Sequence, residues 1–193
     1  MLVVIVIVGI MLGLALPSVT TLMKSGGVSA ASRHVSNTLN LARQYAITHR
    51  TTTRVVFPYS ATTWVGVNPA TPYLAYAVVV KDSTAVHGWT YVGKWEFLPL
   101  GVVFLSGNVV GALSAPPLAS LQIDPAMPFP STASAITSLA YIEFGPTGAA
   151  TQPYTLICQE GLINGGAPQP TSVNGAKYVV DNIIGRIQVT HLP

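Results

Sequence analysis

The hydrophobic pattern divides the chain into an apolar opening run and a longer remainder in which polar and apolar positions alternate. Residues 1–16, MLVVIVIVGIMLGLAL, carry no charge, and Pro17 follows them directly. A helix of this composition has no polar face for water, so it belongs in lipid or inside a bundle of similar helices. At about 1.5 Å per residue it would span roughly 24 Å, somewhat less than the ~30 Å core of a bilayer. A cleavable secretory signal is the less favoured alternative, because no basic residue precedes the run.

A second helical pattern runs from residue 28 to about residue 48. Its apolar residues recur at spacings of three and four, which places them on one stripe of a helix: Val28, Ala31, Val35, Leu39, Ala42 and Ala46. Polar residues lie off the centre of this stripe, namely Arg33, Asn37, Asn40, Arg43 and Gln44. Between the two halves, Pro17 removes a backbone donor and the pair Gly26 and Gly27 weakens a helix. We therefore expect one long helix from near Met1 to about Thr48, disturbed around residues 17–27.

The remainder predicts strands and loops only. Short runs rich in Val, Thr, Trp and Tyr, separated by turn residues, are typical of antiparallel strands, here at residues 51–57, 62–67, 73–80, 93–97, 102–105, 139–144, 154–158, 177–180 and 186–190. The stretches rich in Gly, Ser and Pro predict two long loops, residues 106–137 with one short strand near 118–123, and residues 161–175. A helix followed only by strands predicts an α+β fold in which the stripe of residues 28–46 covers an antiparallel sheet.

Charge is sparse and unevenly distributed. Only 8% of the residues are charged, and a surface so poor in charge is easier to reconcile with burial against neighbouring molecules than with a free monomer. Residues 1–54 carry a net charge of +5 and residues 55–193 a net charge of −2. The basic helix could meet acidic surface on another subunit or anionic headgroups, or it could simply be solvated. The single cysteine, Cys158, excludes an internal disulfide and is expected in a buried strand.

The residues that usually carry catalysis form no recognisable site. The four histidines and six acidic residues have no metal-ligand or paired-carboxylate spacing, and no glycine-rich loop opens a helix. We therefore expect neither an enzyme nor a bound cofactor or metal.

Several segments resemble one known family. The run LVVIVIVGIMLGLALPSV, with its striped continuation, looks like the amino-terminal helix of type IV pilins and type II secretion pseudopilins. Four further segments resemble the GspH/FimT-like branch of that family: LNLARQYAI at residues 39–47, WEFLPLGVVF at 95–104, YIEFGPTG at 141–148 and GRIQV at 185–189. Together these pieces cover nearly the whole chain.

The resemblance implies a pilin-like fold, with residues 1–27 as the membrane and filament-core helix and residues 28–193 as the soluble domain. It implies a structural subunit held in the bacterial inner membrane by a single pass, with its domain in the periplasm, and then assembled into a helical filament. The helix residues expected to serve the membrane and the filament are Leu2, Ile5, Gly9, Gly13, Ala15 and Pro17. Implied partners are other pilin or pseudopilin subunits, the assembly platform, and the prepilin peptidase acting on a full-length precursor. The family's conserved glutamate would fall immediately before Met1, so we expect the precursor to begin upstream.

A DNA-binding minor pilin is the alternative function. Some FimT-like members bind DNA through arginines near a carboxy-terminal GRxR motif, which here reads Gly185-Arg186-Ile187-Gln188 and lacks the second arginine. Lys177 and Arg186 are the candidate DNA contacts, and so few cations predict weak binding. A third hypothesis, a membrane-tethered binding module or enzyme, has no supporting motif. The sequence leaves open whether the assembly is a secretion system or a pilus, and whether the subunit is major or minor.

Overall fold

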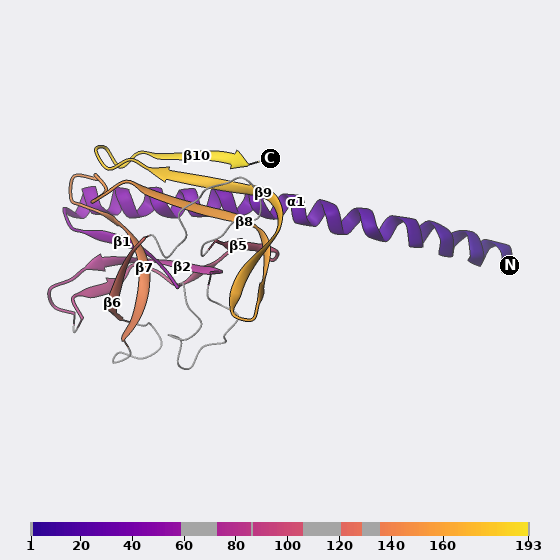
Figure 1. Ribbon diagram of the computed structural model, residues 1–193, viewed down its shortest axis with the longest axis horizontal. Helices are drawn as coiled ribbons and strands as arrows, with labels where there is room; N and C mark the ends of the chain where they lie inside the picture. The colour runs from indigo at the N-terminus through magenta and orange to yellow at the C-terminus, as the bar shows by residue number, and fades with distance from the viewer. Residues whose placement is uncertain (1, 59–72, 86, 106–120, 129–135, 193) are drawn as a thin grey trace.

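A computed structural model describes the backbone of residues 2–58, 73–85, 87–105, 121–128 and 136–192. Side chains are described from residue 26 onward within these ranges, apart from those of residues 123, 125–128 and 136–138. One helix, α1 (Leu2–His49), precedes all the strands of the described chain. The first half of α1 stands away from the rest of the molecule, and its second half lies along the strands (Figure 1).

The expected single long helix is confirmed, and it continues as helix through residues 17–27, so an interruption of the helix there is wrong. A helix can continue past an internal proline at the cost of one backbone hydrogen bond. Gly27 has a packing role: a Cβ atom at this position would lie 3.3 Å from Cγ2 of Val102 and 3.7 Å from the backbone oxygen of Leu100. The missing side chain lets the helix approach a strand closely, and this contact offsets the weak helix propensity of glycine.

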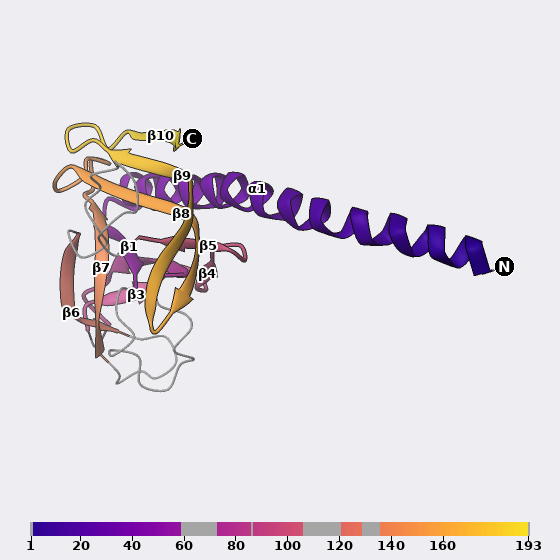
Figure 2. The ribbon, with the colours of Figure 1, turned by 45° about the vertical axis from the view of Figure 1, so that its right-hand side comes forward.

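The apolar stripe predicted on the second half of α1 is confirmed as the buried face of the helix. All six of its residues are buried, and the hydroxyl residues Ser32 and Thr38 are buried beside them. The helix contacts strands from both sheets of the domain, and it lies along the smaller sheet in two views (Figures 1 and 2). The helix is therefore the structural core of the domain as well as its protruding arm.

The larger sheet follows the helix directly. Its strands are β1 (Thr53–Phe57), β2 (Ala75–Lys81), β3 (Trp89–Tyr91), β4 (Glu96–Phe97), β6 (Gln122–Pro128) and β7 (Ile136–Phe144). They are antiparallel in the order β3-β2-β1-β7-β6. Strand β4 pairs with the first two residues of β2, Ala75 and Tyr76, whereas β3 pairs with its last three. Val55 in β1 pairs with Val78 and Ile142 on its two sides, so one row of buried residues crosses the sheet.

The smaller sheet carries the carboxy-terminal end of the chain. Its strands are β5 (Val102–Phe104), β8 (Tyr154–Asn164), β9 (Ala167–Val180) and β10 (Ile187–Leu192), antiparallel in the order β10-β9-β8-β5. The main core fills the space between α1 and the two sheets. Phe104 contributes edge-to-face contacts with Phe57 and Tyr76, with ring centres 5.2 and 5.9 Å apart, and so joins the sheets beneath the helix.

The predicted α+β class, a helix packed on antiparallel sheet, is confirmed, and most predicted strands are found within a few residues of their expected ends. The strand expected at 62–67 lies outside the described residues. The strand expected at 93–97 is reduced to β4, and β3 precedes it instead. Gly93 and Lys94 are poor strand formers, whereas Trp89, Thr90 and Tyr91 are good ones, which accounts for the shift.

The loop expected at residues 161–175 is wrong. Strands β8 and β9 continue through it as a hairpin that closes at Gly165 and Gly166, whose φ angles are +60° and +79°. A two-residue turn of this kind requires positive φ at both positions, which glycine adopts without strain. The short strand expected near 118–123 overlaps β6, which continues to Pro128, and β7 begins within the last two residues of the loop expected at 106–137. Strand β6 accommodates Asp124 and Pro125 because it lies at the edge of its sheet and its register shifts there.

Candidate assembly surfaces

The six helix residues expected to serve membrane and filament all lie on the protruding part of α1, namely Leu2, Ile5, Gly9, Gly13, Ala15 and Pro17 (Figure 2). Their side chains are outside the described part of the structure. Within that part, no helix is long and apolar enough to cross a membrane.

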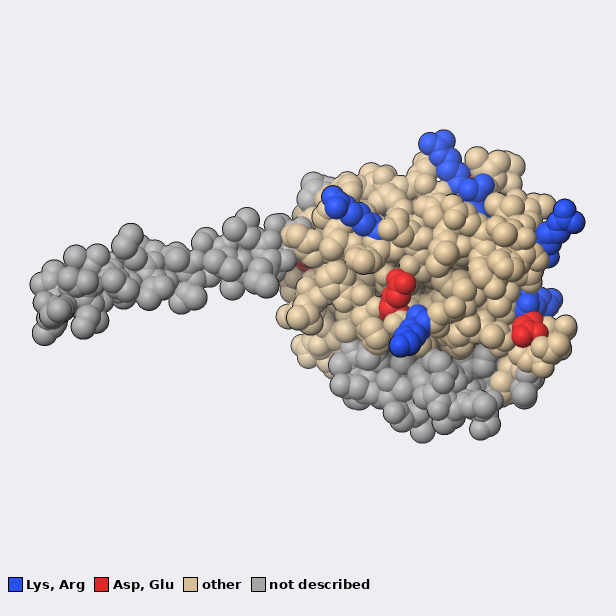
Figure 3. Space-filling model, turned by 180° about the vertical axis from the view of Figure 1, so that it is seen from behind, with Lys and Arg blue, Asp and Glu red and all other residues tan. Residues whose placement is uncertain are grey.

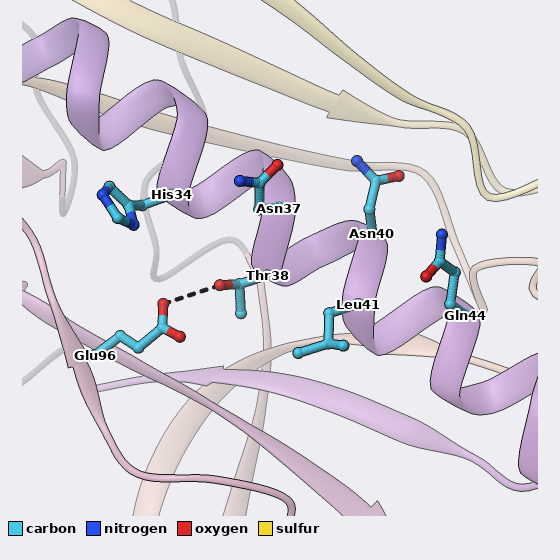
Figure 4. Close-up of a pocket in the computed structure, with 7 residues that line it drawn as sticks. All are labelled: His34, Asn37, Thr38, Asn40, Leu41, Gln44 and Glu96. Atoms are coloured by element: carbon cyan, nitrogen blue, oxygen red, sulfur yellow. Dashed lines mark hydrogen bonds between the residues drawn. The ribbon is translucent and has the colours of Figure 1, made fainter.

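A shallow groove of about 400 Å³ runs along the exposed face of the second half of α1 (Figure 4). The helix contributes its polar side chains His34, Asn37, Thr38, Asn40 and Gln44 together with Leu41, and β4 contributes Glu96. The Thr38 hydroxyl donates a hydrogen bond of 3.0 Å to Oε2 of Glu96, which connects helix and sheet at the groove floor. The carboxamides offer both donors and acceptors, so the groove suits a polar partner surface.

Sequence reasoning placed the carboxamides on the polar side of the helix but missed the contact with Glu96. Thr38 and Glu96 are 58 positions apart, and no local pattern pairs them. The same carboxylate influences the core beneath: burial raises the pKa of Tyr76, and the charge of Glu96 raises it further. Tyr76 thus remains a neutral hydroxyl at physiological pH.

A second buried hydroxyl lies farther along the core. The side chains of Cys158 and Tyr178 lie 3.3 Å apart, from the thiol sulfur to the phenol oxygen. Burial raises the pKa of the Cys158 thiol to about 11. The thiol is therefore protonated and shielded at physiological pH, so it is a core residue as the sequence indicated.

The two candidate DNA contacts are not brought together. Lys177 lies in β9 opposite Thr190, whereas Arg186 is exposed just before β10, where its backbone oxygen accepts a hydrogen bond of 3.0 Å from the amide of Asp181. Four ladder positions separate them, or about 13 Å along the strand. An acidic residue thus lies beside Arg186, and the pair forms no concentrated positive surface.

Acidic residues do converge at one place, on the larger sheet. Arg54 donates from Nε to Oε2 of Glu143 and from Nη1 to Oδ2 of Asp124, both at 2.6 Å. The guanidinium of Arg54 thus holds both carboxylates and ties β1 to β6 and β7. The spacing in the sequence gave no signal of this cluster, because the three residues come from β1, β6 and β7. Among the described residues, no group of three metal-ligating side chains comes together.

Comparison with known proteins gives two similar solved structures. No known protein family and no curated protein matches the chain. The type IV minor pilin FimU of Pseudomonas aeruginosa is 12% identical, covers 86% of this chain and 92% of its own, and has a TM-score of 0.48. The minor pseudopilin EpsH of the type 2 secretion system of Vibrio cholerae is 10% identical, covers 86% and 97%, and has a TM-score of 0.48.

Proposed function

We propose that this chain is a pilin-like structural subunit, a minor pseudopilin of the GspH/FimT type, in a type II secretion system or a type IV pilus. The observation that carries the proposal is the 48-residue helix α1. One face of its second half is buried against the domain, and its first half protrudes and has an apolar sequence. Such a helix joins a folded domain rigidly to a segment that needs apolar surroundings.

The apolar half would be stored in the bacterial inner membrane, with the domain in the periplasm, and would then move into the core of a filament. The membrane step rests on the apolar sequence of residues 1–16. Transfer from lipid to a helical core gains little hydrophobic free energy, so close packing has to favour the filament. Gly9, Gly13 and Ala15 would allow neighbouring helices to approach closely. The partners are other pilin or pseudopilin subunits and the assembly platform, with a prepilin peptidase acting on a full-length precursor.

Replacement of Gly13 by leucine tests this proposal. Gly13→Leu adds bulk at the proposed helix contact, whereas leucine is at home in lipid. We expect normal amounts of the variant in the membrane fraction and a strongly reduced yield of sheared filaments, measured in cells that carry the complete assembly machinery and a precursor with its leader.

The matched control is Val8→Leu, which adds one methylene at a residue outside the small-residue set. It should leave both the membrane fraction and the filament yield unchanged. Normal filament yield from Gly13→Leu would mean that this position makes no packed contact in a polymer, and a simple membrane tether would then explain the helix better.

A further inference from the structure

Five large apolar side chains of the described residues are more than half exposed; one is Phe97 in β4, at 58%, and the other four lie at two places on the domain. Leu100 is 98% exposed, Ile183 77%, Leu162 61% and Ile184 56%. Large apolar side chains this exposed on an otherwise weakly charged surface are typical of protein contacts. On the face seen in Figure 3, lysine and arginine side chains are scattered rather than gathered into one patch.

Leu100 and Leu162 form a proximal patch, at the end of the domain from which the first half of α1 emerges. Leu100 occupies the turn between β4 and β5, and its backbone oxygen lies 3.7 Å from the Cβ position of Gly27. The amide of Gly161 donates a hydrogen bond of 2.9 Å to the backbone oxygen of Gly101, which joins the two segments next to the patch residues. The patch is thus fixed to the helix where the helix enters the domain.

Ile183 and Ile184 form a distal tip at the other end of the domain. They occupy the turn between β9 and β10, where their amides donate hydrogen bonds of 2.8 and 3.1 Å to Oδ1 of Asp181. A Cβ atom at Gly185, the next residue, would lie only 3.2 Å from Nε of Arg43, near the end of α1. Side-chain hydrogen bonding at Asp181 and helix packing therefore hold the two isoleucines toward solvent.

The helix gives the distance between the two surfaces. Gly27 marks the proximal patch and Arg43 the distal tip, and 16 residues of helix separate them, or about 24 Å. The protruding part of α1, residues 2–26, is about 37 Å long. It is therefore longer than the separation of the two surfaces on a second copy that is shifted along the same direction.

Charge also matches across the two surfaces. Glu160 lies at the β-bulge between Gln159 and Gly161 in β8, two residues before Leu162, and its carboxylate accepts hydrogen bonds of 2.8 Å from Ser172 and from Asn174. Arg186 follows the distal tip and is exposed. Neither residue forms an ion pair with any described residue. Opposite charges at the rims of two apolar surfaces favour one orientation of contact.

We propose that the distal tip of one copy of this chain seats on the proximal patch of a second copy, with Arg186 facing Glu160. The proposal rests on the proposed function and specifies which surfaces of the domain meet. Because the two surfaces are different and lie at opposite ends, the contact is head-to-tail rather than the symmetric contact of a closed dimer.

Cysteine cross-linking of the purified full-length chain in lipid tests the contact. Cys158 is buried and its thiol is protonated, so only the introduced cysteines are expected to form intermolecular disulfides. The double variant Leu100→Cys with Ile183→Cys should form dimers, trimers and larger species on mild oxidation. A mixture of the two single variants with different tags should give only mixed dimers, and each single variant alone should give none.

The matched control is Leu41→Cys combined with Ile183→Cys, because Leu41 is an exposed leucine in the groove of α1. This double variant should give no series of cross-linked dimers, trimers and larger species. Dimers from either single variant would show a symmetric contact, and an equal yield from the Leu41 control would show non-specific collision; both results would overturn the proposal.

Sedimentation of the same samples separates this proposal from the proposed function. Sedimenting assemblies that lack the cross-link between positions 100 and 183 would overturn the head-to-tail contact and leave the proposed function standing. Absence of both assemblies and cross-links would overturn the contact between copies and count against self-assembly of this chain.

Discussion

Arg54 is the residue with the densest set of charged and aromatic contacts in the described chain. Besides its two ion pairs at 2.6 Å, the centre of its guanidinium group lies 4.1 Å from the ring centre of Trp89 and 3.9 Å from that of Tyr141. Its side chain is 12% exposed, so these contacts are only weakly screened by water. Arg54 joins β1, β3, β6 and β7 on the face of the larger sheet away from α1.

Removal of this charge should destabilise the domain. Arg54→Met keeps the apolar stem and leaves Asp124 and Glu143 without their guanidinium partner. We expect a loss of about 2–4 kcal/mol in the free energy of unfolding, measured by urea denaturation of the full chain in detergent. The control Arg33→Met changes an exposed arginine on the helix and should cost less than about 0.5 kcal/mol. Equal stability of the two variants would contradict a structural role for the Arg54 cluster.

At the scale of elements, the adjacent glycines Gly26 and Gly27 should respond oppositely to substitution. A Cβ atom at Gly26 meets nothing within 4 Å, whereas one at Gly27 lies 3.3 Å from Val102. Gly26→Ala should therefore stabilise the protein by up to about 1 kcal/mol through helix propensity. Gly27→Leu should destabilise it by about 1–3 kcal/mol, because its side chain has no room against β5. Thermal unfolding of both variants checks the pair, and a stabilised Gly27→Leu would show that the helix is not seated closely on Val102.

The elements also show what a sequence pattern can predict. The stripe on α1 was predictable because its burial depends on spacing along one helix, and spacing is visible in the sequence. The hairpin of residues 161–175 was not, because β9 alternates there between exposed and half-buried residues, and Pro168 and Pro170 interrupt a strand pattern. Contacts such as Thr38 with Glu96 and Arg54 with Asp124 depend on how distant elements pack, which no local pattern encodes.

At the scale of the whole molecule, the distribution of charge argues against strong binding of nucleic acid. Arg186 and Lys177 lie about 13 Å apart along the ladder, and Asp181 lies beside Arg186. Affinity for DNA scales with the number of phosphates neutralised, and two separate cations neutralise few. We expect a gel shift with the full chain and duplex DNA at physiological salt to give a dissociation constant no tighter than about 10⁻⁵ M. Sub-micromolar binding that is lost in Arg186→Ala would favour the DNA-uptake hypothesis instead.

The central claim is that the apolar half of α1 packs against the same segment of neighbouring subunits in a filament. Disulfide formation by Ala15→Cys tests it most directly, because the substitution keeps a small side chain on the protruding helix and Cys158 is buried. In cells with the complete assembly machinery, we expect efficient cross-linking of Ala15→Cys in sheared filaments and little in the membrane fraction. Absence of the chain from sheared filaments, or equal cross-linking in both fractions, would contradict the account.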